Sequence, residues 1–217
     1  MMPYASRTGT KRNIEAMRRA GWRMLCEPSQ LSRYGGQRPP LAYALDNGAW
    51  GCFQKGVDFD SESFLKMLGW LGDDADWIVV PDIVQGGLDS LLFSLTWLSR
   101  VLSFGAALIA VQDGMETADV SDLLNDRVGI FLGGSTEWKL ETMREWGELA
   151  RKKKGPLPCG QSQHGKKNTP LPGRRGTLLR RDKRYPVFLQ SSKARQREET
   201  GTSFPRHGGG LKEPTSG

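Results

Sequence analysis

The chain changes character close to residue 154. Residues 1–150 hold 14 Lys and Arg against 20 Asp and Glu and include all seven Trp, whereas residues 151–217 hold 17 Lys and Arg against 4 Asp and Glu. A segment of about 150 residues can bury roughly two-thirds of its unfolded surface, so the first part is long enough for its own core. The second part is rich in Gly, Pro, Arg and Lys, a composition typical of disorder. We therefore expect a domain over residues 1–154 and an irregular basic tail over residues 155–217.

Short apolar runs alternate with amphipathic runs in the first part. The apolar runs predict strands that are buried on both faces, as in a parallel sheet covered by helices. In the helix expected over 60–71, Phe64, Leu65, Leu68 and Leu71 should face the core. The expected strands are 22–26, 41–45, 77–80, 106–111 and 128–132, and the expected helices are 11–21, 60–71, 88–103, 117–125 and 136–153.

Polar or glycine residues follow four of the expected strands. They are Asp46, Asp82, Gln112 and the pair Gly133-Gly134. The carboxyl ends of parallel strands are where α/β proteins place their sites. A carboxylate can transfer a proton, a Gln amide matches a purine edge, and Gly-Gly lets the backbone approach a ligand. Each residue alone has an ordinary explanation as a helix cap, a loop hydrogen bond or a turn, but their succession at four strand ends predicts a site.

Several segments resemble motifs of the tRNA-guanine transglycosylases, also called queuine tRNA-ribosyltransferases. Leu45–Phe53 resembles their Asp-Ser-Gly-Gly-Phe motif, Ala110–Gly114 their Val-Gln-Gly-Gly motif, and Phe131–Glu137 their Gly-Gly-Leu motif. Asp82 falls where the family carries a base-recognising Asp. The resemblance covers residues 4–154 and is strongest to the short members from phages and genomic islands, which resemble 7-deazaguanine DNA-modifying transglycosylases.

The resemblance implies an α/β fold of the (β/α)₈ TIM-barrel type, here incomplete. It implies a base exchange in which an aspartate attacks C1′ of a nucleotide and displaces guanine, after which a 7-deazaguanine takes its place. Asp46 would be the second catalytic carboxylate. The implied partners are a nucleic acid, DNA rather than tRNA, and a 7-deazapurine base, with no cofactor and no metal. The residues implied in base binding are Asn47, Phe53, Asp82, Gln112, Gly133 and Gly134.

The segment that carries the family's nucleophile is missing from this reading frame. In the +1 frame, Cys159–Gly165 can be read as Val-Gly-Arg-Val-Asn-Thr and Arg180–Arg184 as Asp-Gly-Thr-Ser, which are the missing family segments in the right order. We expect the slip near Lys152–Lys154, because Lys codons are A-rich and runs of one base favour insertions and deletions. We therefore expect a frameshifted tail and a chain that is inactive in base exchange.

Two other functions stay open. A non-enzymatic α/β domain could bind nucleic acid through the phosphates with its basic tail, although Tyr185, Phe188 and Phe204 are the only aromatic residues there. Another barrel hydrolase is disfavoured because both His, His164 and His207, lie in the tail. No apolar run reaches the ~18 residues of a membrane span. The scattered Cys suit a reducing compartment, so we expect a cytoplasmic protein without a membrane partner.

Overall fold

The structure is a computed structural model that describes residues 2–32, 36–153 and 188–189. Strands and helices alternate along the chain, as expected for an α/β protein. The strands are β1 (Tyr4–Ser6), β2 (Arg23–Cys26), β3 (Tyr43–Leu45), β4 (Ile78–Val79), β5 (Ala107–Val111), β6 (Val128–Leu132) and β7 (Phe188–Leu189). The helices are α1 (Lys11–Arg19), α2 (Ala49–Lys55), α3 (Ser61–Leu71), α4 (Gly87–Leu102), α5 (Thr117–Val120) and α6 (Thr136–Lys153).

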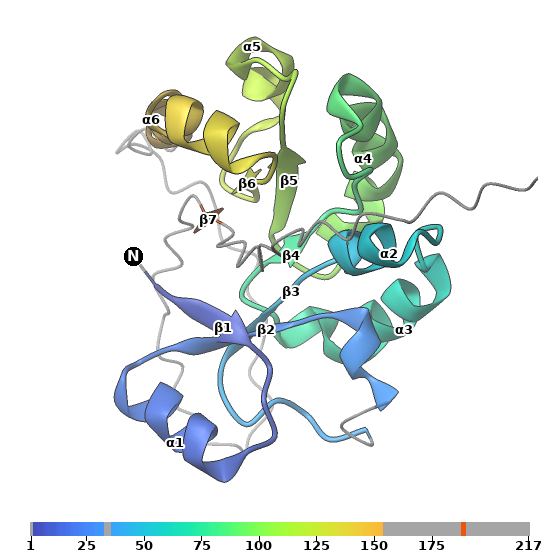
Figure 1. The fold of residues 1–217 in the computed structure, drawn as a ribbon, viewed down its shortest axis with the longest axis vertical. Coiled ribbons are helices and arrows are strands. Elements are labelled where there is room, and N and C mark those ends of the chain that lie inside the picture. The colour runs from blue at the N-terminus through green and yellow to red at the C-terminus, as the bar shows by residue number, and fades with distance from the viewer. Residues whose placement is uncertain (1, 33–35, 154–187, 190–217) are drawn as a thin grey trace, which may run out of the picture.

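The strands form one parallel sheet in which the order in space is the order in the chain, from β1 to β7. Figure 1 shows the strands near the centre and α1, α3, α4, α5 and α6 around the outside. The predicted parallel sheet with covering helices is therefore confirmed. In the described part of the chain, β1 and β7 are the two edge strands.

The two residues of β7 depart from the expectation of an irregular tail. They pair in parallel with β6, with Phe188 opposite Phe131 and Leu189 opposite Leu132. The remaining tail, and with it the prediction for residues 155–187 and 190–217, lies outside the described residues.

Both faces of the sheet are buried. In β5, Ala107, Ile109 and Val111 pack with helical side chains, whereas Leu108 and Ala110 point to the opposite face. This alternation follows from the two-residue period of a strand and explains why the strand sequences are apolar throughout. The second face has its own core, made only of residues from the strands and their ends: Ala44, Trp77, Val79, Ala106, Leu108, Ala110 and Phe131.

The sheet is curled around this second core. The rings of Tyr4, in β1, and Trp77, just before β4, lie 4.9 Å apart between centroids, although β2 and β3 separate their strands. In a flat sheet, strands three positions apart are about 14 Å from each other. The Tyr4 hydroxyl also donates to Asp76 at 3.2 Å, and burial followed by the Asp76 charge raises the pKa of Tyr4 to about 12. Asp76 forms an ion pair with Arg23 at 2.6 Å as well.

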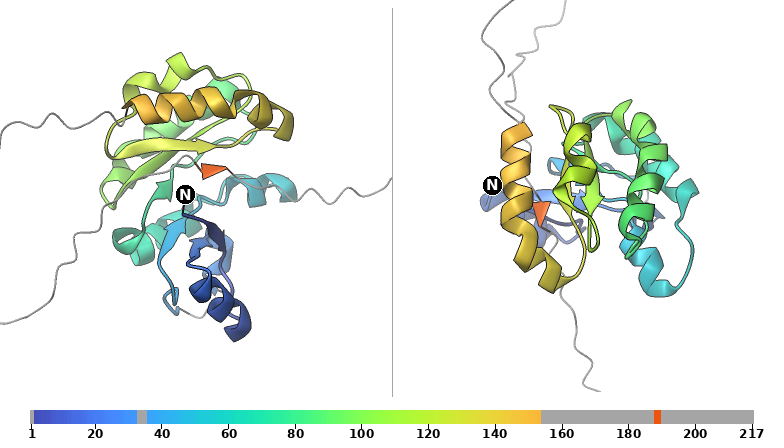
Figure 2. Two further views of the ribbon diagram at one scale, coloured as in Figure 1. Left: turned by 90° about the vertical axis from the view of Figure 1, so that its left-hand side faces the viewer. Right: turned by 90° about the horizontal axis from the view of Figure 1, so that it is seen from above.

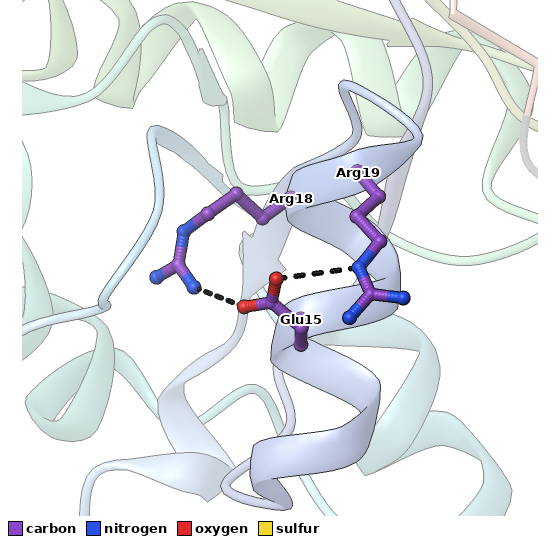
Figure 3. A network of polar contacts seen from close by, with 3 residues as sticks. All are labelled: Glu15, Arg18 and Arg19. Atoms are coloured by element: carbon purple, nitrogen blue, oxygen red, sulfur yellow. Dashed lines mark hydrogen bonds and ion pairs between the residues drawn. The ribbon is translucent and has the colours of Figure 1, made fainter.

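Helix α1 carries most of its charge as exposed cations. Lys11, Arg12, Arg18 and Arg19 are all exposed, and Glu15 is the one acidic residue in the helix. Figure 3 shows the Glu15 carboxylate between two guanidinium groups, at 2.8 Å from Arg18 and 3.3 Å from Arg19. Exposed pairs of this kind add little stability. Four cations against one carboxylate leave the helix strongly basic.

The remaining differences from the sequence-based expectation are local. In α3, Leu65 is 36% exposed and Met67 is buried in its place, so the inward position of Leu65 was wrong. The helix expected over 117–125 ends at Val120 and continues as a 3₁₀ turn over Ser121–Leu123. Strand β1 and helix α2 were not predicted. Helix α6 packs along β6, as Figure 2 shows.

Candidate functional site

The predicted strand-end residues lie at one edge of the sheet. Asp46 and Asn47 follow β3, Asp82 follows β4 after two residues, Gln112 follows β5, and Gly133 follows β6. Because these four strands are parallel neighbours, their carboxyl ends are adjacent in space. The hydrogen bonds around these residues show which of them are in direct contact.

Asn47 joins the ends of β3 and β4. Its side chain is buried, with 3% exposed, and Nδ2 donates to the Val80 carbonyl at 2.8 Å and to Asp82 Oδ1 at 2.6 Å. Its Oδ1 accepts from the Ala49 amide at 2.8 Å. Two buried donors and one buried acceptor are thus satisfied within the protein, so Asn47 fixes the position of the Asp82 carboxylate.

Asp46 is a half-buried carboxylate with a pKa near neutrality. Burial raises the pKa of Asp46 to about 6, a hydrogen bond from the Gly48 amide opposes this rise, and the negative charge of Glu27 adds to it. The Gly48 amide donates to Asp46 Oδ1 at 2.9 Å. Gly48 has a φ of 82°, and a Cβ there would lie 2.9 Å from Pro28 Cδ, so only glycine fits at this turn.

Asp82 has a similar pKa for a related reason. Burial raises the pKa of Asp82 to about 6, the hydrogen bond from Asn47 lowers it, and the charge of Asp46 raises it further. The structure therefore brings Asp46 close enough for its charge to act on the ionisation of Asp82. Carboxyl groups that exchange protons near neutral pH suit general acid–base chemistry or recognition of N–H groups.

Gln112 contacts the segment that follows Asp82. Its Nε2 donates to the Ile83 carbonyl at 2.8 Å, and its Oε1 accepts from the Gln85 amide at 2.7 Å. Gln85 has a φ of 61°, a left-handed conformation that is uncommon for a residue other than glycine. Gln112 and Asp82 are therefore brought together through a shared backbone segment.

Gly133 and Gly134 lie beside Asp113. Gly134 has a φ of 79°, and a Cβ there would lie 2.5 Å from Asp113 Oδ2 and 2.9 Å from the Trp138 ring. Asp113 accepts from the Ser135 amide at 2.7 Å and from the Ser135 hydroxyl at 2.6 Å. Burial raises the pKa of Asp113, but the bonds from Ser135, a bond from its own backbone and the charge of Lys139 together outweigh burial and lower the pKa. The turn at Gly133-Gly134 thus packs against Asp113, which lies just after the end of β5.

Phe53 belongs to an exposed aromatic pair on α2. The rings of Trp50 and Phe53 are stacked, with centroids 5.6 Å apart and planes at 25°. Trp50 is 43% and Phe53 is 44% exposed, so both rings present surface to solvent. Helix α2 begins directly after the Asp46–Gly48 turn, which puts the pair next to the carboxylates along the chain.

Sequence reasoning missed several residues that shape this edge. Ser90 and Ser94 of α4 have no exposed surface, and their hydroxyls bond to the Ile83 amide at 3.0 Å and the Pro81 carbonyl at 2.8 Å. Arg7, at the end of β1, is 6% exposed and donates to the Gln37 carbonyl. The sequence did carry a signal for the two serine contacts, because Ser90 and Ser94 interrupt the otherwise apolar face of the predicted helix.

Two kinds of feature were sought in the described part of the chain, a metal-binding group and a membrane-spanning helix. This part contains no group of three or more His, Cys, Asp or Glu that could hold a metal ion. Of its helices, none combines the length and the apolar character that crossing a membrane requires.

Comparison of the chain with models of protein families, with curated proteins and with solved structures found no match in any of the three. The resemblance to the transglycosylases therefore depends on the motifs quoted above.

Proposed function

We propose that residues 1–154 form the N-terminal part of a (β/α)₈ barrel of the transglycosylase type, and that its strand-end edge binds a purine or 7-deazapurine base. The observation that carries this proposal is the contact of Asn47 with Asp82 beside Asp46, with both carboxyl groups at a pKa of about 6. The curled sheet with strands in sequential order supports the barrel.

In this proposal, each residue has a chemical role. The ionised Asp82 accepts N–H groups of the purine edge, and the Gly133-Gly134 backbone lies close to the base. Asp46 takes up and returns a proton near neutral pH, which its pKa of about 6 allows. The exposed ring of Phe53 offers a surface for stacking.

Base exchange itself needs a nucleophile that this reading frame does not carry. We therefore expect the chain to bind a base without exchanging it. Loss of a nucleophile lowers the rate by about 10⁴-fold or more. The test is incorporation of labelled 7-deazaguanine into DNA or tRNA by this chain and by the version with the +1 frame restored after Lys154. Exchange by the restored version alone supports the proposal, and equal exchange by both overturns the missing-nucleophile argument.

Base binding can be tested in the chain as it is. Guanine and 7-deazaguanine are titrated by calorimetry against the wild type, Asp82→Ala and the control Asp89→Asn, an exposed carboxylate of α4. We expect Asp82→Ala to lose at least 10-fold in affinity, because a charge-assisted hydrogen bond is removed. Wild-type affinity in Asp82→Ala contradicts the assignment of Asp82.

A second function is favoured by the charge of the tail, where 17 Lys and Arg stand against 4 Asp and Glu. A non-enzymatic protein would bind nucleic acid through this tail and would not need the strand-end residues. Nucleic-acid binding that is unchanged in Asp82→Ala, together with no binding of either base, would favour this alternative.

A further inference from the structure

The backbone segment that contains Asp82 is held by side chains from three other elements. Asn47, after β3, donates to the Val80 carbonyl. Ser90 and Ser94 come from α4, and Gln112 comes from the end of β5. Side chains on three sides thus bond to consecutive peptide groups of one short segment.

The two serines are placed where α4 would otherwise be apolar. Both side chains are fully buried, since neither has exposed surface. Burying a hydroxyl is unfavourable unless it is hydrogen-bonded, and each of these forms one bond to the segment. The helix therefore places polar groups in its buried face at the two positions that touch the Pro81 carbonyl and the Ile83 amide.

Gln112 spans the segment with both ends of its amide. Its Nε2 donates to the Ile83 carbonyl at 2.8 Å, and its Oε1 accepts from the Gln85 amide at 2.7 Å. This pair of bonds selects one orientation of the side chain and closes a small loop around the residue between them. Gln85 holds a φ of 61°, which is unfavourable for a residue with a Cβ and persists only where the surroundings enforce it.

We propose that Gln112 is a positioning residue: it clamps Ile83–Gln85 and thereby places the carboxylate of Asp82, which directly precedes the clamp. The inference rests on the proposed base binding at Asp82. It differs from the role that the resemblance implies for Gln112, which is direct contact with the base. Ser90 supports the same clamp from the helix side, since it accepts the Ile83 amide at 3.0 Å.

The first arm of the test measures the clamp without any ligand. Hydrogen exchange of the Gln85 amide is followed by NMR in the wild type, in Gln112→Met and in Gln112→Glu. Met keeps the length of the side chain and forms neither bond, so exchange should become at least 10-fold faster. Glu still accepts from the Gln85 amide but loses the donor to the Ile83 carbonyl, so its exchange should lie between those of the wild type and Gln112→Met. Unchanged protection in Gln112→Met overturns the clamp, and so does protection in Gln112→Glu that is no higher than in Gln112→Met.

The second arm separates positioning from direct contact. Calorimetric Kd values for guanine and 7-deazaguanine are compared for the wild type, Gln112→Met, Ser90→Ala and the control Thr96→Ala, an exposed residue of α4. Ser90 is fully buried and cannot reach a ligand, so a purely positioning effect should appear in Ser90→Ala as a 3- to 10-fold weaker Kd. Normal affinity in Ser90→Ala with loss only in Gln112→Met means that Gln112 contacts the base and overturns the proposal.

The two arms distinguish a failure of the proposed base binding from a failure of the proposed clamp. A wild type that binds neither base contradicts the proposed function, whereas the exchange of the Gln85 amide still decides whether the clamp exists.

Discussion

At the scale of single residues, the carboxyl groups of Asp46 and Asp82 have no cationic partner among the described residues. None of the ion pairs of the described residues includes Asp46 or Asp82. Their hydrogen bonds come from Gly48 and Asn47. Uncharged donors lower a carboxyl pKa less than a guanidinium does, so burial prevails and both groups titrate near pH 6.

This predicts a stability that falls as the pH rises. The pKa of Asp46 in the folded protein, about 6, lies above the ordinary pKa of 3.8 for an Asp carboxyl. The stabilisation from its proton is therefore complete below pH ~4 and is lost as the pH rises through ~6. Asp46→Asn, which mimics the protonated carboxyl, should therefore gain about 1.4 kcal/mol in free energy of unfolding relative to the wild type between pH 5 and pH 7.5.

The measurement is urea unfolding at both pH values, with Asp89→Asn as the control. A constant difference between Asp46→Asn and the wild type across this range would show that Asp46 is not held at a raised pKa.

A second residue-scale prediction concerns the turn after β6. Gly134→Ala forces a Cβ to 2.5 Å from Asp113 Oδ2 at a φ of 79°, so we expect a loss of about 2–3 kcal/mol in the free energy of unfolding. Gly51 in α2 is the matched control, because a Cβ there meets nothing within 4 Å. Gly51→Ala should be neutral or stabilise by up to about 1 kcal/mol. Equal effects of the two substitutions would rule out the close approach at Gly134.

At the scale of elements, the sequence predicted the long apolar strands and the helices between them. β6 has the predicted bounds, and α4 and α6 agree within one residue. β1 was missed because three residues, Tyr4–Ser6, give no usable period. α2 was missed because its seven residues include Gly51 and lack an apolar stripe. Short elements of this kind are fixed by tertiary contacts rather than by local pattern.

The same reason explains what was missed at the site. The sequence identified Asp46, Asp82 and Gln112, because a polar residue that follows an apolar run can be recognised without a structure. The partners of Gln112 are backbone groups 27 and 29 residues away, and no local pattern connects them. Whether Asp82 binds a base stays a prediction.

The contact between β1 and the start of β4 gives a prediction for the curled sheet. Tyr4→Ala removes the ring that packs on Trp77 and should lower the free energy of unfolding by about 2 kcal/mol, less than for a fully buried aromatic residue because Tyr4 is only partly buried. Tyr4→Phe keeps the ring, loses the bond to Asp76 and should cost about 1 kcal/mol. Urea unfolding of both variants is the measurement, and a negligible effect of Tyr4→Ala would mean that β1 does not close onto this core.

At the scale of the whole molecule, charge is separated along the domain. Residues 1–50 hold 8 Lys and Arg against 3 Asp and Glu, whereas residues 51–150 hold 6 against 17. The first group includes α1 with its four exposed cations. A polyanion that approaches the domain is attracted to the first group and repelled by the second.

We therefore expect α1 to contribute to any binding of nucleic acid by the full chain. The double variant Lys11→Glu/Arg12→Glu should bind single-stranded DNA more weakly and lower the slope of log K against log salt by about 1–2. The control is Lys66→Glu/Arg144→Glu, which reverses two exposed cations on α3 and α6. Equal losses in the two double variants would mean that only the net charge matters.

The sequential strand order also has a consequence during synthesis. Each strand pairs with the one made just before it, so the sheet can grow in step with the ribosome without waiting for a distant partner. The contact of Tyr4 with Asp76, 72 residues later, is an exception. At about 5–20 residues per second, the first strand emerges roughly 4–15 s before the groups that cover it. During this interval, the side of β1 that later packs against Trp77 and Asp76 stays uncovered on the nascent chain.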